Sequence, residues 1–252
     1  MSWLTKSVLG ASIVLTSILN TGCISLSSNS NQQRLEQIIE KNYKMASRPT
    51  VCVRSNKNYI GTAFAYAEKG DYIYFLTNHH LIEKRSLYDE IKLEIVDNDL
   101  DYYEKDNIPL ELVLYSEDKD IAIFKAPKKK INEWNKNKIE PIEVYKGKIG
   151  SSRIIPGERV LVCGYTLGRY KALTEGIVSY IADCPMLKYK HKDVAVDAAA
   201  NAGNSGSPIL KYNGNDLELI GIFHVHHEGS EGMNHGILIS EIEDLLKKAL
   251  EY

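Results

Sequence analysis

Several features that define common protein classes are scarce in this sequence, and each shortage excludes a class. The 252 residues hold four cysteines and no Cys-x-x-Cys pair, which leaves no support for a disulfide-stapled scaffold or a structural zinc site. An excess of one charge is also missing, because 31 Lys and Arg balance 33 Asp and Glu to a formal net charge of −2. That balance argues against a nucleic-acid binder and against a strongly basic protein of the membrane surface. The chain is long enough to bury a substantial globular core.

The N-terminal segment has the layout of an export signal. Lys6 precedes an apolar run, Ser7 to Leu19, that is too short to span a bilayer comfortably. The small residues of Thr21-Gly22-Cys23 resemble a bacterial lipoprotein processing site. We therefore predict that residues 1–22 are an export signal, and that a lipid on Cys23 anchors the protein to a membrane outside the cytoplasm. An uncleaved anchor and a plain secretory signal are the alternatives.

Residues 23–47 are predicted to form the lipidated tether and a short helix. The polar stretch Ser25 to Gln33 is typical of a flexible tether, and the apolar spacing within Gln32 to Met45 indicates a short amphipathic helix. With Cys23 modified, an odd number of cysteines remains, so at most one disulfide can form. The remaining cysteines are Cys52, Cys163 and Cys184.

The rest of the chain, residues 48–252, is dominated by short β-rich runs separated by turn signals, which predicts an all-β domain of two lobes. The strands expected in the first lobe, residues 48–138, are Thr50 to Arg54, Tyr59 to Ala67, Asp71 to Thr77, Ile91 to Val96, Pro109 to Tyr115 and Asp120 to Ala126. The charged segment Lys128 to Lys138 is predicted to be a solvated crossover to the second lobe.

The second lobe, residues 139–240, repeats this pattern, with Asn213-Gly214 as a hairpin signal. Its expected strands are Arg159 to Tyr165, Ala172 to Ala182, Asp193 to Asp197, Ser207 to Tyr212, Leu217 to His227 and His235 to Ile239. Residues 241–252 have helical spacing, and Ser240 with Glu243 matches a capping box. The prediction is therefore two six-stranded antiparallel β-barrels, a short N-terminal helix and a C-terminal α-helix.

One loop, Ala202 to Pro208 (AGNSGSP), suggests chemistry. Gly203 and Gly206 free the backbone to turn tightly and to aim N–H groups at one point beside Ser205. A hydroxyl beside converging N–H donors suits an acyl-transfer enzyme, although a Gly/Ser-rich hairpin turn is the simpler interpretation.

Upstream residues supply the partners that such a serine needs. The strand ending in TNHHL carries His79 and His80, and strand alternation predicts that only one of them faces a cleft. Asp120 heads the apolar segment DIAIF, where a carboxylate can be buried at a lobe interface and accept a hydrogen bond from an imidazole. A turn aspartate is the alternative interpretation.

Together these motifs resemble the trypsin/chymotrypsin superfamily, and in particular its bacterial Deg/HtrA-type and glutamyl-endopeptidase-type branches. TNHHL resembles the segment around the family's base, which implies this role for His80, and DKDIAIF implies that Asp120 is the orienting acid. DAAANAGNSGSP, residues 197–208, resembles the nucleophile block. The resemblance implies Ser205 as nucleophile and the N–H groups of Gly203 and Ser205 as the oxyanion hole.

The resemblance implies a trypsin-like fold and a serine endopeptidase that acts on protein or peptide substrates, on exported or cell-envelope proteins, without a cofactor. A catalytically latent binding module with the same fold is the alternative from another class. An α/β-hydrolase esterase would need a GxSxG elbow and its histidine last in the chain, so this class is set aside. Asn204 stands where zymogen-type proteases carry an aspartate, so we expect no activation by clipping of the N-terminus.

By the geometry of the superfamily, residues 197–202 and 222–227 line the specificity pocket. Ala199 and Ala200 offer no acid to receive Lys or Arg. His224 and His226 lie on one face of the predicted strand, and they could favour an acidic substrate side chain, bind a metal ion or be ordinary solvent-facing residues. The sequence assigns no metal site.

Overall fold

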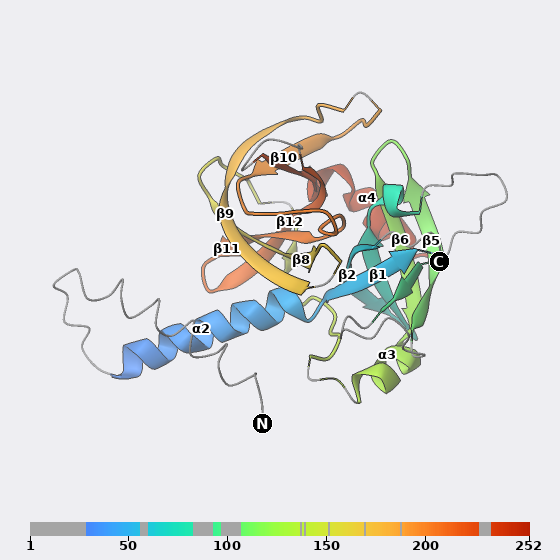
Figure 1. Ribbon diagram of the computed structural model, residues 1–252, viewed down its shortest axis with the longest axis horizontal. Coiled ribbons are helices and arrows are strands. Elements are labelled where there is room, and N and C mark those ends of the chain that lie inside the picture. Colours follow the sequence, from blue (N-terminus) through green and yellow to red (C-terminus); the bar gives the residue numbers. More distant parts are fainter. Residues whose placement is uncertain are drawn as a thin grey trace. The chain divides into compact units, whose positions relative to one another are not determined.

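A computed structural model describes residues 29–55, 60–82, 93–96, 107–136, 138, 140–150, 152–168, 170–186, 188–226 and 233–252 (Figure 1). The predicted export signal and the lipidation site Cys23 lie outside the described residues. The chain divides into two compact units, residues 1–39 and 40–252, and the strands of the described residues lie in the second unit.

The N-terminal helix is longer than the sequence predicted. Helix α2 covers Asn29–Ser47, so residues 29–31, expected only in the flexible tether, are helical. Asn and Ser are favoured at the start of a helix and Gln within it, so the helix begins before the apolar pattern does. No helix in the described residues is both long enough and apolar enough to cross a membrane.

The first barrel closes as β1-β2-β3-β6-β5-β4, with β4 pairing back onto β1. Its strands are β1 (Thr50–Ser55), β2 (Ile60–Lys69), β3 (Tyr72–Thr77), β4 (Leu93–Ile95), β5 (Ile108–Ser116) and β6 (Ile121–Pro127). All of them match predicted strands, because apolar residues alternate into a core formed by side chains such as Val53, Phe75 and Phe124.

The second barrel has the order β11-β8-β9-β10-β13-β12, closed by the pairing of β11 with β12. Its strands are β8 (Arg159–Thr166), β9 (Tyr170–Asp183), β10 (Lys192–Val196), β11 (Pro208–Asn213), β12 (Asp216–His226) and β13 (Asn234–Leu238). The two closed antiparallel barrels confirm the predicted fold class.

A short strand that the sequence did not predict, β7 (Lys148–Ile149), runs parallel to β12. Beside it Glu218 is fully buried, 3.3 Å from Lys148 Nζ, and its carboxylate accepts the Ser152 N–H at 3.2 Å. Burial alone would raise the pKa of Glu218, but the hydrogen bonds from Ser152 and Lys148 outweigh it and hold the pKa below its usual value.

Two helical segments differ from the sequence prediction. The crossover begins with helix α3 (Lys128–Asn135), which the sequence did not predict and which is anchored by the buried Ile131. The capping box is wrong: Ser240 lies inside the 3₁₀ turn η2 (Ile239–Glu241), and α4 (Glu243–Ala249) starts after Ile242 with no side-chain cap. The 3₁₀ turn shifts the helix start beyond the reach of the serine.

The two barrels share a core, since one apolar cluster includes Phe64 and Leu76 from the first barrel with Leu161 and Ile237 from the second. Helix α4 joins this cluster through Leu246. The cysteines in the described part of the chain form no disulfide; Cys52 and Cys163 are buried and Cys184 is half-buried. Because the barrels are packed on each other, side chains from both can be held in fixed positions at their interface.

Candidate active site

The His–Asp pair expected from the sequence is formed at the end of β3. His80 Nδ1 lies 2.8 Å from Asp120 Oδ2, and the His80 N–H donates to Asp120 Oδ1 at 2.9 Å. The His80 side chain is 27% exposed whereas that of Asp120 is 1% exposed. A buried carboxylate therefore orients an imidazole whose other edge can reach solvent, which is the arrangement a general base needs.

His79 and His80 are not in a strand, so the alternation used to separate them does not apply. Both lie in the 3₁₀ turn η1 (His79–Leu81), which follows β3. The turn directs His80 toward Asp120, whereas the His79 ring stacks on Tyr115 with 5.0 Å between ring centroids. The choice of His80 over His79, made from family resemblance, agrees with this geometry.

Asp120 is held in an uncommon backbone conformation just before β6. Its φ of 51° lies in the left-handed region, which Asp tolerates better than most residues. Three hydrogen bonds hold it there: its N–H donates to Glu117 O, and its C=O accepts the His79 N–H and the Asn78 side-chain amide, each at 3.1 Å. The peptide and the carboxylate of Asp120 thus both fix the turn that carries His80.

Ser205 lies half-buried in the predicted loop, between β10 and β11. Its C=O accepts the Thr62 N–H at 2.8 Å, which links the loop to the first barrel. The next residue, Gly206, donates its N–H to Phe223 O at 2.9 Å and has a φ of 88°. A Cβ at Gly206 would lie 1.9 Å from Thr62 O, so only glycine fits where the loop meets the first barrel.

The segment before Ser205 forms a tight turn. The Asn204 N–H donates to Asn201 O at 3.0 Å, Gly203 has a φ of 93°, and Ala202 is not among the residues with positive φ. A positive φ at the third turn residue alone defines a type II turn. Within the described part of the chain the N–H groups of Gly203 and Ser205 make no hydrogen bond, so two donors beside Ser205 stay available to bind an anion.

Thr62 is a fully buried residue that links the two barrels, and no sequence motif pointed to it. Its hydroxyl donates to Gly203 O at 2.9 Å and accepts the Tyr165 N–H at 3.0 Å. Together with the bond from its N–H to Ser205 O, these contacts bind the first barrel to both sides of the turn. Thr62 therefore positions the loop that carries Ser205, and only the three-dimensional pairing of the barrels reveals it.

His224 is a second histidine that lies close to the buried carboxylate of Asp120. It is the extra residue of a β-bulge in β12, between Phe223, which pairs with Gly236, and Val225. The bulge re-aims the side chain inward, so that His224 Nδ1 lies 3.6 Å from Asp120 Oδ2. The residue is 3% exposed, which corrects the interpretation of His224 as a solvent-facing strand residue.

The two histidines shift the ionisation of the acid between them. Burial alone would raise the pKa of Asp120, but the nearby imidazoles of His224 and His80 outweigh it and hold the pKa well below its usual value. Burial likewise would lower the pKa of His224, yet the nearby carboxylates of Asp120 and Asp193 raise it to about 10. Asp120 is therefore an ionised carboxylate that can stabilise an imidazolium at His80.

The other residues predicted for the substrate pocket lie in separate surroundings. Ala199 is exposed, Ala200 is half-buried beside an apolar cluster of the second barrel, and the side chain of His226 lies outside the described atoms. The ring of His224 lies beside the carboxylates of Asp120 and Asp193. The pocket role of these four residues stays a prediction.

Asn204 is buried and its amide is satisfied within the loop. Its Nδ2 donates to Thr166 Oγ1 at 3.3 Å and to Asn201 O at 3.2 Å, and its Oδ1 accepts the Ser207 hydroxyl at 3.4 Å. A neutral side chain with internal partners needs no charged terminus to hold the turn. The expected lack of activation by N-terminal clipping has this physical basis and stays a prediction.

Paired closed barrels that carry a His–Asp pair on one side and a glycine-flanked serine on the other define the architecture of chymotrypsin-like proteases. The sequence agrees, since residues 61–222 match the family model described as trypsin-like peptidase domain. The chain belongs to this family.

Relatives and solved structures of similar fold point the same way. Protease Do-like 1, chloroplastic, of Arabidopsis thaliana is 22% identical over 196 residues, which are 76% of this chain and 39% of the relative, so the chain spans about two fifths of that protein. The HtrA-type protease AlgW with tripeptide has a TM-score of 0.63 at 21% identity, covering 84% of this chain and 63% of that chain. The crystal structure of Deg5 has a TM-score of 0.59 at 21% identity, covering 83% of this chain and 92% of that chain. These structures share the fold of a Deg/HtrA-type serine protease domain.

Proposed function

We propose that this protein is a serine endopeptidase that hydrolyses peptide bonds through an acyl-enzyme intermediate. The observation that carries the proposal is the 2.8 Å contact between His80 Nδ1 and the buried carboxylate of Asp120, on the barrel to which the Ser205 loop is hydrogen-bonded. Membership of the trypsin-like peptidase family supports it independently.

In the proposed mechanism Ser205 Oγ attacks the peptide carbonyl, and His80 Nε2 accepts the proton of the hydroxyl. Asp120 keeps the proton of the neutral imidazole on Nδ1 and stabilises the imidazolium that forms. The negative oxygen of the tetrahedral intermediate is bound by the N–H groups of Gly203 and Ser205. His80 then gives its proton to the leaving amine. Water next attacks the acyl-enzyme in the same way, with His80 again as the general base. Each step uses only groups of this chain, the substrate and water.

The direct test replaces the nucleophile. Ser205→Ala should lower hydrolysis of a denatured protein by roughly 10⁴-fold or more, because the acyl-enzyme can no longer form. Ser207→Ala, two residues away in the same loop, is the matched control and should leave most of the activity. Hydrolysis that survives in Ser205→Ala at the wild-type rate would refute the proposal.

A serine-directed phosphonate probe separates an active enzyme from the latent binding module. The proposed enzyme reacts with the probe at Ser205, and His80→Ala abolishes the reaction, because the serine then lacks its base. A folded wild-type protein that is not labelled, and that hydrolyses no denatured substrate, would favour the latent module.

The cellular setting is a second part of the proposal and depends on the sequence of the N-terminal segment. We propose that residues 1–22 direct export and that Cys23 is lipidated, so that the protein acts on exported or cell-envelope proteins. Growth with labelled palmitate should label the wild-type protein but not Cys23→Ala. Equal labelling of both proteins, or of neither, would refute lipidation at Cys23.

A further inference from the structure

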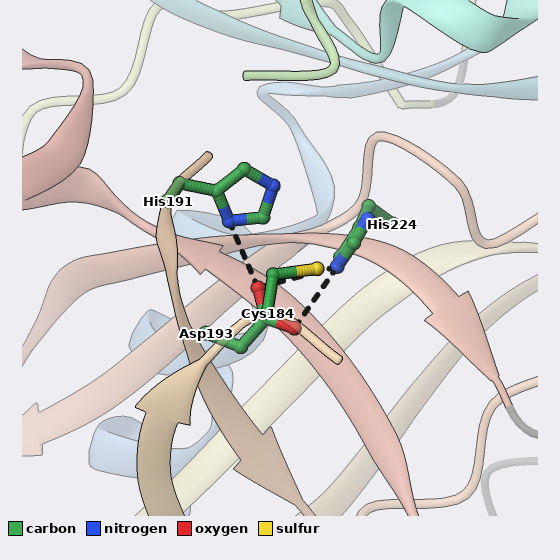
Figure 2. Close-up of side chains that lie close together, drawn as sticks. All are labelled: Cys184, His191, Asp193 and His224. Atoms are coloured by element: carbon green, nitrogen blue, oxygen red, sulfur yellow. Dashed lines mark hydrogen bonds and ion pairs between the residues drawn. The ribbon is translucent and has the colours of Figure 1, made fainter. Parts of the chain in front are cut away.

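Beside Asp120, the acid of the proposed triad, four side chains of the second barrel with metal-binding atoms lie close together (Figure 2). They come from three places: Cys184 directly follows β9, His191 and Asp193 flank and begin β10, and His224 lies in the bulge of β12. One ligand atom from each lies within 4.8 Å of the others. Three of these residues, His191, Asp193 and His224, have completely buried side chains.

Hydrogen bonds satisfy only some of the polar atoms in this cluster. His191 Nδ1 lies 3.0 Å from Asp193 Oδ1, close enough for an ion pair, yet the two atoms lack the direction of a hydrogen bond. Within the described part of the chain, both nitrogens of His191, Asp193 Oδ1 and His224 Nδ1 have no hydrogen-bond partner. Buried polar atoms without partners are costly, so a native site of this kind calls for a ligand that satisfies several of them at once.

The geometry and the charge suit one small divalent cation. Zinc bonds of about 2.0–2.3 Å at tetrahedral angles place ligand atoms about 3.3–3.8 Å apart. His224 Nε2 already lies 3.3 Å from Asp193 Oδ1, and the widest spacing in the cluster must shrink by only about 1 Å. One thiolate and one carboxylate cancel the two positive charges of the ion, so the buried site would carry no net charge.

We propose that Cys184, His191, Asp193 and His224 bind one zinc ion. Sulfur and imidazole ligands favour zinc over calcium and magnesium, which need oxygen ligands. A single cysteine contributes to the site, so no Cys-x-x-Cys motif indicated it in the sequence. The alternating pair His224 and His226 had suggested a metal at this strand, and the structure gives His224 different partners.

Neighbouring residues provide the outer shell that such a site requires. His235 Nδ1 lies 3.2 Å from Asp193 Oδ2, the oxygen that also faces His224 Nε2, and orients the carboxylate. His224 bound to zinc through Nε2 would direct its Nδ1–H toward Asp120 Oδ2, 3.6 Å away. A carboxylate that accepts the second N–H of a metal-bound histidine is the common outer-shell arrangement of zinc sites.

The zinc ion would thereby position the proposed triad without touching substrate. It would fix the ring that contacts Asp120, and it would fix the loop of residues 184–191, whose ends are joined by the hydrogen bond from the Cys184 N–H to His191 O at 2.9 Å. The same loop reaches the first barrel, because the Lys190 N–H donates to Asp118 O at 2.8 Å. His224 and this loop are therefore positioning elements, and zinc binding itself does not depend on hydrolysis.

The test measures binding in a protein that cannot cleave itself. The Ser205→Ala protein, stripped with a chelator, should take up about one zinc ion per chain in competition with a chromophoric chelator, and zinc should raise its unfolding temperature. Cobalt in place of zinc should give a thiolate-to-metal charge-transfer band and the visible absorption of tetrahedral cobalt. Cys184→Ser should remove the charge-transfer band and weaken zinc binding beyond the 10–100-fold typical for loss of an outer-shell partner.

The matched control is the double variant Cys52→Ala/Cys163→Ala, which removes the other described cysteines and should keep both the stoichiometry and the band. If Cys184→Ser does not fold, the cobalt spectrum of this control decides, because Cys184 is then the remaining thiolate of the protease domain. Absence of stoichiometric zinc binding, or a charge-transfer band that survives in folded Cys184→Ser, would overturn the proposal. Neither outcome bears on the hydrolysis by the wild-type protein that tests the proposed function.

Discussion

Replacing Thr62 by valine would remove the hydroxyl that links the two barrels while nearly preserving the shape of the side chain. The Thr62 hydroxyl makes two hydrogen bonds, to Gly203 O and from the Tyr165 N–H, and it is fully buried. Thr62→Val leaves both backbone groups without their partner at a place where the protein packs closely. The hydrogen bond from the Thr62 N–H to Ser205 O stays, so the loop keeps one of its connections.

The expected cost follows from these contacts. Each hydrogen bond contributes about 1 kcal/mol net, and an orphaned buried donor or acceptor costs about 1–3 kcal/mol, which gives about 2–4 kcal/mol for the substitution. For a chain of this size, 1 kcal/mol lowers the unfolding temperature by about 2–4 °C, so a fall of about 4–16 °C is expected. A displacement of the turn by ~1 Å would lower kcat by up to ~100-fold, because the proposed oxyanion donors are the N–H groups of Gly203 and Ser205 in this turn.

Thermal unfolding followed by circular dichroism, with kcat and KM on a fluorogenic peptide, measures both effects. Thr62→Ser keeps the hydroxyl and is the matched control: it should restore kcat, while losing some stability with its methyl group. If Thr62→Val unfolds within about 1 °C of the wild type and keeps its kcat, the hydroxyl does not hold the loop and the reasoning is wrong.

Two further predictions concern the backbone and the pH dependence of stability. Gly206→Ala should lower the free energy of unfolding by well over the ~1–2 kcal/mol that an alanine in the left-handed conformation costs, and it should abolish hydrolysis. The reason is that its Cβ would lie 1.9 Å from Thr62 O. Gly70→Ala is the control, because Gly70 has a φ of 59° and nothing within 4 Å of an added Cβ. It should lower the free energy of unfolding by only ~1–2 kcal/mol and keep activity. Equal losses of stability for the two variants in urea unfolding would contradict this difference. Glu218 has a pKa below its usual value, so its ionised form stabilises the fold above pH ~4.3 and this contribution disappears as the pH falls through the lowered pKa. Urea unfolding of Glu218→Gln and wild type should therefore differ at pH 7 and converge toward pH 3, and a difference that grows on acidification would refute the assignment.

Most strands were predictable because an antiparallel barrel imposes a local pattern on its sequence. One face of each strand is buried, so apolar residues alternate, and strands such as β8 and β11 start within one residue of their predicted positions. The two-residue β7 carries no such pattern, because its pairing with β12 is parallel and depends on distant residues. Ser240 failed as a cap for a related reason, since a 3₁₀ turn and the capping motif compete for the same residues.

The His–Asp pair was predictable because both residues stand beside strong strand signals. The neighbours of Asp120 were not, since they depend on strand register and on a bulge. Asp193 and Ile222 both pair with Ile237 of β13, which brings β10 and β12 to the same height, and the bulge then turns His224 toward Asp193. A sequence shows neither the register nor the bulge, so the cluster at Cys184 appears only in three dimensions.

The bond between the Thr62 N–H and Ser205 O also governs when the site comes into existence. A chain emerges from the ribosome N-terminus first, so the first barrel is complete long before Ser205 is made. The loop then needs β12 for the bond from Gly206 to Phe223, and β12 needs β13, which ends at Leu238. A truncated or unfinished chain therefore holds no assembled site. The proposed protease would therefore become active only after synthesis of the last strand of its second barrel.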